Sequence, residues 1–160
     1  MIDRNGTFVF EAMYEDLGLL SEGLSYAMVA ERYGYYNVSG EMVIPHLFDD
    51  AYDFKDGVAK VEKEGNQGYI DTSGIFIIPA VYESIEWYQD TLLVFSDDGL
   101  YGIMNTQAQI YVEPQFTWIN PLREGLAVAE LDDRIVYLDS VGTIVIDNGF
   151  EVYPNYQLKG

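Results

Sequence analysis

Cysteine is absent from this chain of 160 residues, and histidine occurs only once. Without cysteine the chain has no disulfide and no thiolate metal site, a composition that suits the cytosol. The one histidine, His46, follows Pro45, and we expect it in a surface loop rather than in a catalytic or metal site. We therefore expect neither a metal nor a cofactor.

The start of the chain lacks the features of a signal peptide, because Met1 to Gly6 runs directly into a predicted turn. No apolar run approaches the length that is needed to cross a bilayer. The expectation is a soluble, cytoplasmic protein that does not bind membranes.

Basic residues are also scarce. The chain has 27 acidic and 8 basic residues, a formal net charge of −19, and no lysine or arginine lies between Glu64 and Leu122. One interpretation is solubility, since a high net charge keeps a β protein with exposed strand edges monomeric. The other interpretation is a surface that matches a basic partner. Direct binding to nucleic acid is disfavoured because phosphates would repel this surface.

Helical periodicity and catalytic motifs are missing as well. No window of about 11 residues holds a convincing helical stripe, whereas 14 Tyr, 8 Phe and frequent Val and Ile favour strands. No serine elbow, phosphate-binding loop, dinucleotide fingerprint or zinc spacing is present. Paired acids occur at Asp49-Asp50, Asp97-Asp98 and Asp132-Asp133, each in a predicted turn or loop. The expectation is an all-β protein that is not an enzyme, with a carboxylate-based hydrolase as an alternative.

The chain does contain a repeat with a period of 34 residues. Glycines recur at Gly34, Gly68 and Gly102, with Val136 in the fourth place. A second set of glycines falls at Gly6, Gly40, Gly74 and Gly142, with Ala108 as the exception. An aromatic position reads Tyr14, Phe48, Tyr82, Phe116 and Phe150. Several independent positions at one period establish internal repetition.

The clearest copy of the repeat runs from Gly68 to Pro79. Two short apolar runs flank Asp71 to Gly74, a tetrapeptide with the residue types of a type I turn that closes a β-hairpin. The residues that open this turn are Asp3, Asn37, Asp71, Asn105 and Asp139. We expect each side chain to cap its own turn by accepting backbone N–H bonds. A ladder of calcium sites would need about six to eight oxygens per ion, which the turns do not supply.

These hairpins divide the single domain 1–160 into units 1–33, 34–67, 68–101, 102–135 and a partial unit 136–160. Each unit is predicted to contain about four short strands. The predicted fold is an all-β tandem array of β-hairpin repeats, open and twisted, with a five-bladed propeller-like closure as the alternative.

The motifs Tyr33-Gly34-Tyr35, Gln67-Gly68-Tyr69 and Tyr101-Gly102-Ile103, each followed by a turn and an apolar run, resemble the WG-repeat (KWG) family. The downstream segments 54–59 and 122–127 match the second block of that family. The tryptophan that names the family is replaced by Tyr33, Gln67, Tyr101 and Ile135. The resemblance implies a bacterial or phage β-repeat module without a shared catalytic site.

Large aromatic residues break the repeat inside the stretch that has no basic residue. Trp87, Tyr88 and Trp118 stand where the repeat does not require them. Together with nearby acids they form the predicted partner-binding set: Glu83, Glu86, Trp87, Tyr88, Asp90, Asp97, Asp98, Glu113 and Trp118. Such aromatics suit a protein-binding hot spot or stacking on sugars, and core filling beside Thr91 and Leu93 explains them equally well.

The functional expectation is an acidic protein–protein interaction module without catalytic activity. Its partner would be a basic protein, with the chain acting as an inhibitor that occupies a nucleic-acid-binding surface, as nucleic-acid mimics of the phage anti-defence type do. A module that binds carbohydrate or cell-wall polymer is the alternative among binding proteins. We expect the functional residues where the repeat is broken, at Trp87, Thr91, Ala108 and Trp118 and the acids between them.

Overall fold

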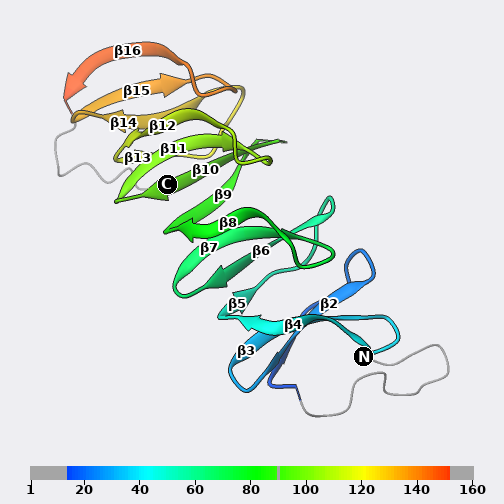
Figure 1. Ribbon diagram of the computed structural model, residues 1–160. Coiled ribbons are helices and arrows are strands. Elements are labelled where there is room, and N and C mark those ends of the chain that lie inside the picture. Colours follow the sequence, from blue (N-terminus) through cyan, green and yellow to red (C-terminus); the bar gives the residue numbers. More distant parts are fainter. Residues whose placement is uncertain (1–13, 90, 152–160) are drawn as a thin grey trace. The chain divides into compact units, whose positions relative to one another are not determined.

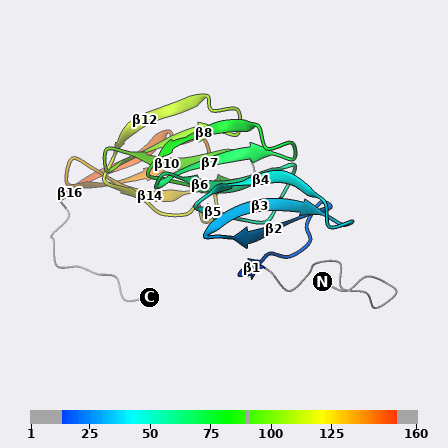
Figure 2. The same cartoon turned by 60° about the horizontal axis from the view of Figure 1, so that its bottom comes forward.

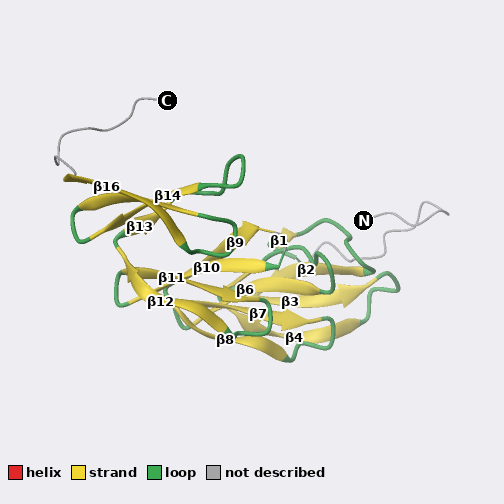
Figure 3. Ribbon diagram, turned by 90° about the horizontal axis from the view of Figure 1, so that it is seen from above, coloured by secondary structure: helices red, strands yellow, loops and turns green. Residues whose placement is uncertain are grey.

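The computed structural model describes residues 14–89 and 91–151. Within these ranges the chain forms strands and turns only, with no helix (Figure 3). The strands β1 to β16 form four antiparallel sheets of four strands each, and none of these sheets closes into a barrel. The prediction of an all-β chain of tandem repeats is confirmed. The first predicted turn, from Asp3 to Gly6, and Asp90 lie outside the described residues.

The chain forms two compact units, Met1–Tyr82 and Glu83–Gly160. The first unit contains two sheets (Figure 1). The strands of the first sheet are β1 (Asp16–Leu17), β2 (Leu24–Val29), β3 (Arg32–Asn37) and β4 (Met42–Phe48). Those of the second sheet are β5 (Asp50–Ala51), β6 (Val58–Lys63), β7 (Asn66–Asp71) and β8 (Phe76–Tyr82).

The second unit repeats this plan with two further sheets. The third sheet contains β9 (Ser84–Gln89), β10 (Leu92–Asp97), β11 (Leu100–Asn105) and β12 (Ile110–Phe116). The fourth sheet contains β13 (Trp118–Ile119), β14 (Ala127–Leu131), β15 (Arg134–Leu138) and β16 (Ile144–Glu151). In every sheet the strands follow one another in chain order. Figure 2 shows this order for β1 to β4.

The strand register repeats with the period of the sequence. Leu24 faces Asn37 in the first sheet, Val58 faces Asp71 in the second, and Leu92 faces Asn105 in the third. The sheets have a different phase from the predicted units, because a unit that begins at a repeat glycine begins inside β3, β7 or β11. Each sheet therefore combines the end of one sequence unit with the beginning of the next.

The turns that close the third and fourth strands of each sheet are capped as expected. The side-chain oxygen of Asp71 accepts hydrogen bonds from the backbone N–H groups of Ser73 at 2.8 Å and Ile75 at 3.0 Å. Asn37, Asn105 and Asp139 make the same pair of bonds in the other three sheets. These bonds lower the pKa of Asp139 because they stabilise its carboxylate. The capping prediction is confirmed for the four turns that the structure describes, and the turn at Asp3 lies outside them.

The repeat glycines have a packing explanation that the sequence did not reveal. After Tyr33, Gln67 and Tyr101 the ladder to the next strand shifts register, so that the neighbouring backbone approaches the glycine. A Cβ atom on Gly68 would lie 2.6 Å from the carbonyl oxygen of Ile78 and 2.7 Å from the amide nitrogen of Ala80. These are backbone atoms, which cannot rotate away, so a side chain here requires a different strand path.

Each unit has its own apolar core. In the first unit Tyr35, Phe48, Phe54 and Ile70 are buried together, and the rings of Tyr35 and Phe54 meet edge to face with centroids 4.9 Å apart. In the second unit the core residues include Tyr88, Phe116, Val136 and Leu138. None of the residues that the structure describes belongs to a helix capable of crossing a membrane.

Candidate functional site

The predicted partner-binding residues that the structure describes all lie in the second unit. Glu83 precedes β9, whereas Glu86, Trp87 and Tyr88 belong to β9 itself. The remaining members lie at the end of β10 (Asp97), in the turn after it (Asp98), in β12 (Glu113) and in β13 (Trp118). The structure therefore brings most of the set to the third sheet.

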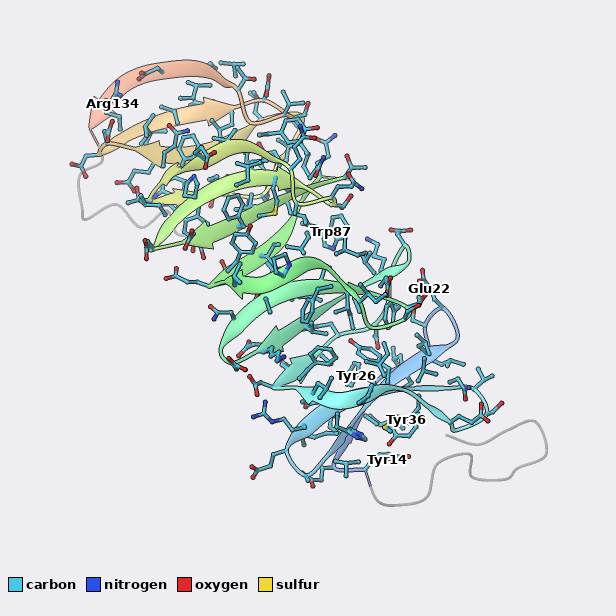
Figure 4. All side chains as sticks on the ribbon, in the orientation of Figure 1. Tyr14, Glu22, Tyr26, Tyr36, Trp87 and Arg134 are labelled. Carbon is cyan, nitrogen blue, oxygen red and sulfur yellow. The ribbon has the colours of Figure 1, made fainter. Side chains whose placement is uncertain are left out.

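A pocket with a volume of about 180 Å³ connects part of this set. Glu86, Trp87 and Tyr88 line it from β9, and Val94 and Tyr101 line it from β10 and β11. Residues 119–121, at the end of β13 and just after it, form another part of its wall. The side chain of Trp87 is half-buried on β9 (Figure 4). The site is thus a small, mostly apolar hollow with one acidic residue, Glu86, among the residues that line it.

The strand that carries these residues differs from its counterparts. β9 has six residues, whereas β1, β5 and β13 have two residues each. Its ladder shifts register between Leu92 and Leu93, where Gln89 and Trp87 are the partners, so Tyr88 is the extra residue of a β-bulge. The bulge lies at the end of β9 that carries Trp87 and Tyr88.

The two rings have different environments. Tyr88 is 6% exposed, and its hydroxyl donates a hydrogen bond of 2.8 Å to the backbone carbonyl of Asp139. Burial, with a smaller contribution from the charge of Asp139, raises the pKa of Tyr88 to about 12. Tyr88 therefore serves the core of the second unit, and Trp87 is the aromatic residue of β9 with more surface to offer.

The acids around the turn between β10 and β11 are arranged by the turn itself. Asp98 has a φ angle of 50°, next to Gly99 with a φ of 73°. The carboxylate of Glu83 accepts a hydrogen bond of 3.0 Å from the backbone N–H of Gly99. One period earlier Asp49 accepts a bond in the same turn, although from the backbone N–H of Glu64, the residue before Gly65. Glu83 thus has a structural role in addition to its charge, whereas Asp97 and Asp98 are exposed.

Glu113 and Trp118 do not line the pocket. Glu113 lies in β12 at a wider hollow of about 630 Å³, which Tyr111, Gln115 and Val141 also line. Trp118 is half-buried in β13, where its backbone faces Glu130 of β14. The structure therefore separates the two tryptophans: Trp87 borders the pocket, and Trp118 is placed elsewhere.

Sequence reasoning missed Val94 and Tyr101 as members of the site. Both occupy positions at which the repeat carries different residues, since Lys60 precedes Val94 by one period and Gln67 precedes Tyr101. An alignment of the repeats with one another shows this variation at both positions. Among the residues that the structure describes, no group of histidine and acidic side chains is arranged to hold a metal ion.

Comparisons with known proteins give the family and a distant likeness of fold. Among solved structures, Hsv2 from Kluyvelomyces marxianus is similar with a TM-score of 0.51 and 12% identity over 86% of this chain and 50% of that chain. KlHsv2 with loop 6CD replaced by a Gly-Ser linker gives a TM-score of 0.46 and 10% identity over 81% and 51%. The chain thus spans about half the length of the solved structures that it matches.

No curated protein matches the sequence. The family model described as "WG containing repeat" matches residues 1–31, 33–66, 68–98 and 101–134, which together make up most of the chain. This chain therefore belongs to the WG-containing repeat family.

Proposed function

We propose that this chain is an acidic interaction module without catalytic activity, and that its third sheet binds a basic protein. The observation that carries the proposal is the pocket in which Glu86 lies beside Trp87 and Tyr101, at a sheet that contains no lysine or arginine. A WG repeat supplies a scaffold for such a surface, and the proposed function resides in the residues that break the repeat.

Charge supports the choice of a basic partner. With a formal net charge of −19, the chain attracts a positively charged surface over long range and repels nucleic acid. The stretch from residue 65 to 121 contributes acids but no basic residue. Electrostatic complementarity of this kind accelerates association and selects the partner, and it weakens as salt screens the charges.

An aromatic anchor supports a specific complex over general attraction. Binding energy in protein interfaces concentrates in a few large side chains, and tryptophan is enriched among them. Trp87 is half-buried, so its ring is held in place before a partner arrives. The exposed acids Asp97 and Asp98 would then form a charged rim, in which carboxylates take the places of phosphates. We therefore extend the proposal to a partner that uses the same basic surface to bind nucleic acid.

A pull-down with matched charge variants tests the proposal. The binding variant reverses Glu83, Glu86, Asp97 and Asp98 to lysine. The control variant reverses four acids of the first unit, Glu15, Glu31, Asp53 and Asp56, and changes the net charge by the same amount. Nuclease-treated lysate is passed over each immobilised protein at low and at high salt, and the retained proteins are identified by mass spectrometry.

The proposal expects one basic protein that wild type and control retain at low salt, and that the binding variant loses. Addition of duplex DNA should release this protein if the chain covers a nucleic-acid-binding surface. Equal retention by all three proteins, or retention that salt does not affect, would contradict the proposal. Binding to a glycan array that disappears in Trp87→Ala would instead support the carbohydrate-binding alternative.

A further inference from the structure

One apolar cross-strand pair recurs in every sheet with the period of the sequence. It joins the third strand of each sheet to the fourth: Tyr35 faces Ile44, Tyr69 faces Ile78, Ile103 faces Val112, and Tyr137 faces Ile146. We call these the stacking pairs. Because successive pairs stand one period apart and have the same register, their surroundings can be compared directly.

In two sheets the stacking pair is covered by a turn of the next sheet in the same unit. In the first unit a Cβ atom on Gly74 would lie 3.0 Å from Cγ2 of Ile44. In the second unit a Cβ atom on Gly142 would lie 2.6 Å from Cδ1 of Ile103 and 3.0 Å from Cγ2 of Val112. The last residue of the Asx-capped turn is thus pressed against the pair. Glycine is needed there for this close approach as well as for its positive φ.

The stacking pair of the fourth sheet, on β15 and β16, is more exposed (Figure 1). Ile146 is 40% exposed, whereas Ile44 is 2% exposed under its turn. Tyr137 is half-buried, whereas Ile103 is fully buried. The fourth sheet therefore presents the apolar position that a glycine turn covers in the first and third sheets.

The covering turn stands at a fixed distance along the sequence. Gly74 follows Ile44 by 30 residues, and Gly142 follows Val112 by the same number. After Ile146 the sequence offers no such turn, since residues 147–160 hold no Asp or Asn with glycine three positions later. A turn that fits this pair has to come from a second copy of the chain.

The turn predicted from Asp3 to Gly6 has the required residue types. It has Asp in the first position and Gly in the fourth, like the turns that end at Gly74 and Gly142. The spacing of 30 residues matches Gly40 to residue 10 of its own chain, whereas it matches Gly6 to no residue of the 160-residue chain. One stacking pair and one glycine turn of this chain are thus left to match each other.

We propose that the stacking pair of the fourth sheet binds the turn from Asp3 to Gly6 of a second copy, so that copies join head to tail. The inference does not depend on the proposed function, because it uses apolar residues outside the third sheet. The contact would bury Ile146 as the turn at Gly74 buries Ile44, and burial of an aliphatic side chain is favourable. The two surfaces in this contact are different, so association can continue from one copy to the next.

Salt should act on this contact in the opposite direction to its action on a basic partner. Each copy has a formal net charge of −19, so two copies repel each other, and added salt screens the repulsion. Sedimentation velocity of the purified 160-residue chain, over a wide range of protein concentration, measures the association. The sedimentation coefficient should rise with concentration, and it should rise more steeply at high salt than at low salt.

A matched pair of variants tests the stacking pair. Ile146→Lys places a charge under the turn and should weaken association by at least about tenfold. Val145→Lys makes the same charge change at the neighbouring residue and should alter association by less than about twofold. It is a suitable control because its counterparts Val43 and Tyr111 stay exposed beside covered pairs. Far-UV circular dichroism and tryptophan fluorescence report whether the variants are folded.

A third variant tests the turn, and mixing tests the pairing of the two surfaces. Gly6→Val adds a side chain to the turn and should weaken association as strongly as Ile146→Lys does. Each of these two variants keeps the surface that the other has lost. An equimolar mixture should therefore form a dimer that neither variant forms alone, and this dimer should not grow further.

The inference is overturned if wild type stays monomeric at every concentration and salt, or if a folded Ile146→Lys associates like wild type. A mixture of the two variants that fails to associate, under conditions in which wild type associates, would also overturn it. A wild type that is monomeric beside a chain ending at residue 151 that associates would assign the stacking pair to the chain's own residues 152–160 instead.

Discussion

The second sheet (β5–β8) and the third sheet (β9–β12) have the same register and different chemistry. Both have an Asx-capped turn and a glycine under the shifted ladder, at Asp71 and Gly68 in one and at Asn105 and Gly102 in the other. The sheets differ in their first strand, which has two residues in β5 and six in β9. The two sheets share the residue types that the backbone geometry requires, namely the turn-capping Asp or Asn and the glycine. Residues whose side chains play no part in that geometry differ between the sheets.

The charges of the two sheets show the same division. Lys55, Lys60 and Lys63 belong to the second sheet or its turns, whereas the third sheet has no basic residue. Neither the capped turns nor the repeat glycines depend on these residues. The frame of a WG repeat can therefore carry either acids together with lysines or acids alone, and comparison of the two sheets locates the difference.

The largest expected effect concerns the shared frame. Valine at Gly68 or at Gly102 should destabilise the chain by about 3 kcal/mol, because each Cβ would lie 2.6 Å from a backbone carbonyl oxygen. Urea unfolding followed by tryptophan fluorescence measures the loss. Val136 occupies the same position in the fourth sheet and is fully buried, so that sheet has accommodated a side chain.

Similar losses at both glycines would show that the second and third sheets share one constraint. If only one of the two sheets tolerated valine, the two glycine positions would not be restricted by the same backbone contact. The neighbouring substitutions Gln67→Ala and Tyr101→Phe, which add no atoms under the ladder, serve as controls for ordinary perturbation of the same strands.

A smaller effect is expected at the turn between the last two strands. Gly74 has a φ of 82°, and Ala108 occupies the equivalent position with a φ of 60°. Gly74→Ala should cost about 1–2 kcal/mol, because the left-handed region is unfavourable for a residue with a Cβ. Ala108→Gly should stabilise the chain by about 0.5–1 kcal/mol for the same reason. Thermal unfolding of both variants checks that one substitution lowers the stability and the other raises it. Changes of the same sign would contradict the shared turn geometry.

The next effect concerns a buried aromatic position that differs between the two sheets. Tyr88 stands where the second sheet has Phe54, and only the tyrosine can donate a hydrogen bond. Tyr88→Phe removes the bond to the carbonyl of Asp139 and should cost about 1 kcal/mol. The carbonyl keeps its bond from the N–H of Gly142, which limits the loss. A chemical unfolding experiment measures it, and an unchanged stability would show that the hydroxyl is not needed.

Local interactions made much of the fold predictable. The Asx-capped turns that close the hairpins depend on a few consecutive residues, and the structure confirms them in the four sheets that it describes. The ends of the short strands were less predictable: β4 ends at Phe48 and β5 contains only Asp50 and Ala51. The ends of these strands depend on pairing with β3 and β6, which a single short segment does not encode.

The site was less predictable for a related reason. The break in the repeat identified Trp87, because an unexpected tryptophan is visible in the sequence alone. The distinction between Trp87 and the buried Tyr88 depends on a bulge, and the participation of Val94 and Tyr101 depends on the ladder between three strands. Both features follow from the cross-strand register, and the type of a single residue does not specify that register.

The smallest expected effect is the pH dependence caused by His46. The prediction of a surface loop for this residue is wrong, because His46 lies half-buried within β4, at the position of Ala80 in the second sheet. Burial lowers the pKa of His46, whose ring nitrogen Nε2 lies 3.3 Å from the hydroxyl of Tyr36. The neutral ring is favoured in the folded chain, so its contribution is complete above the unfolded pKa of about 6.5. That contribution is lost as the pH falls through 6.5 toward the lower folded value. The unfolding free energy of wild type relative to His46→Ala should therefore fall between pH 8 and pH 5, and a constant difference would contradict the burial of this ring.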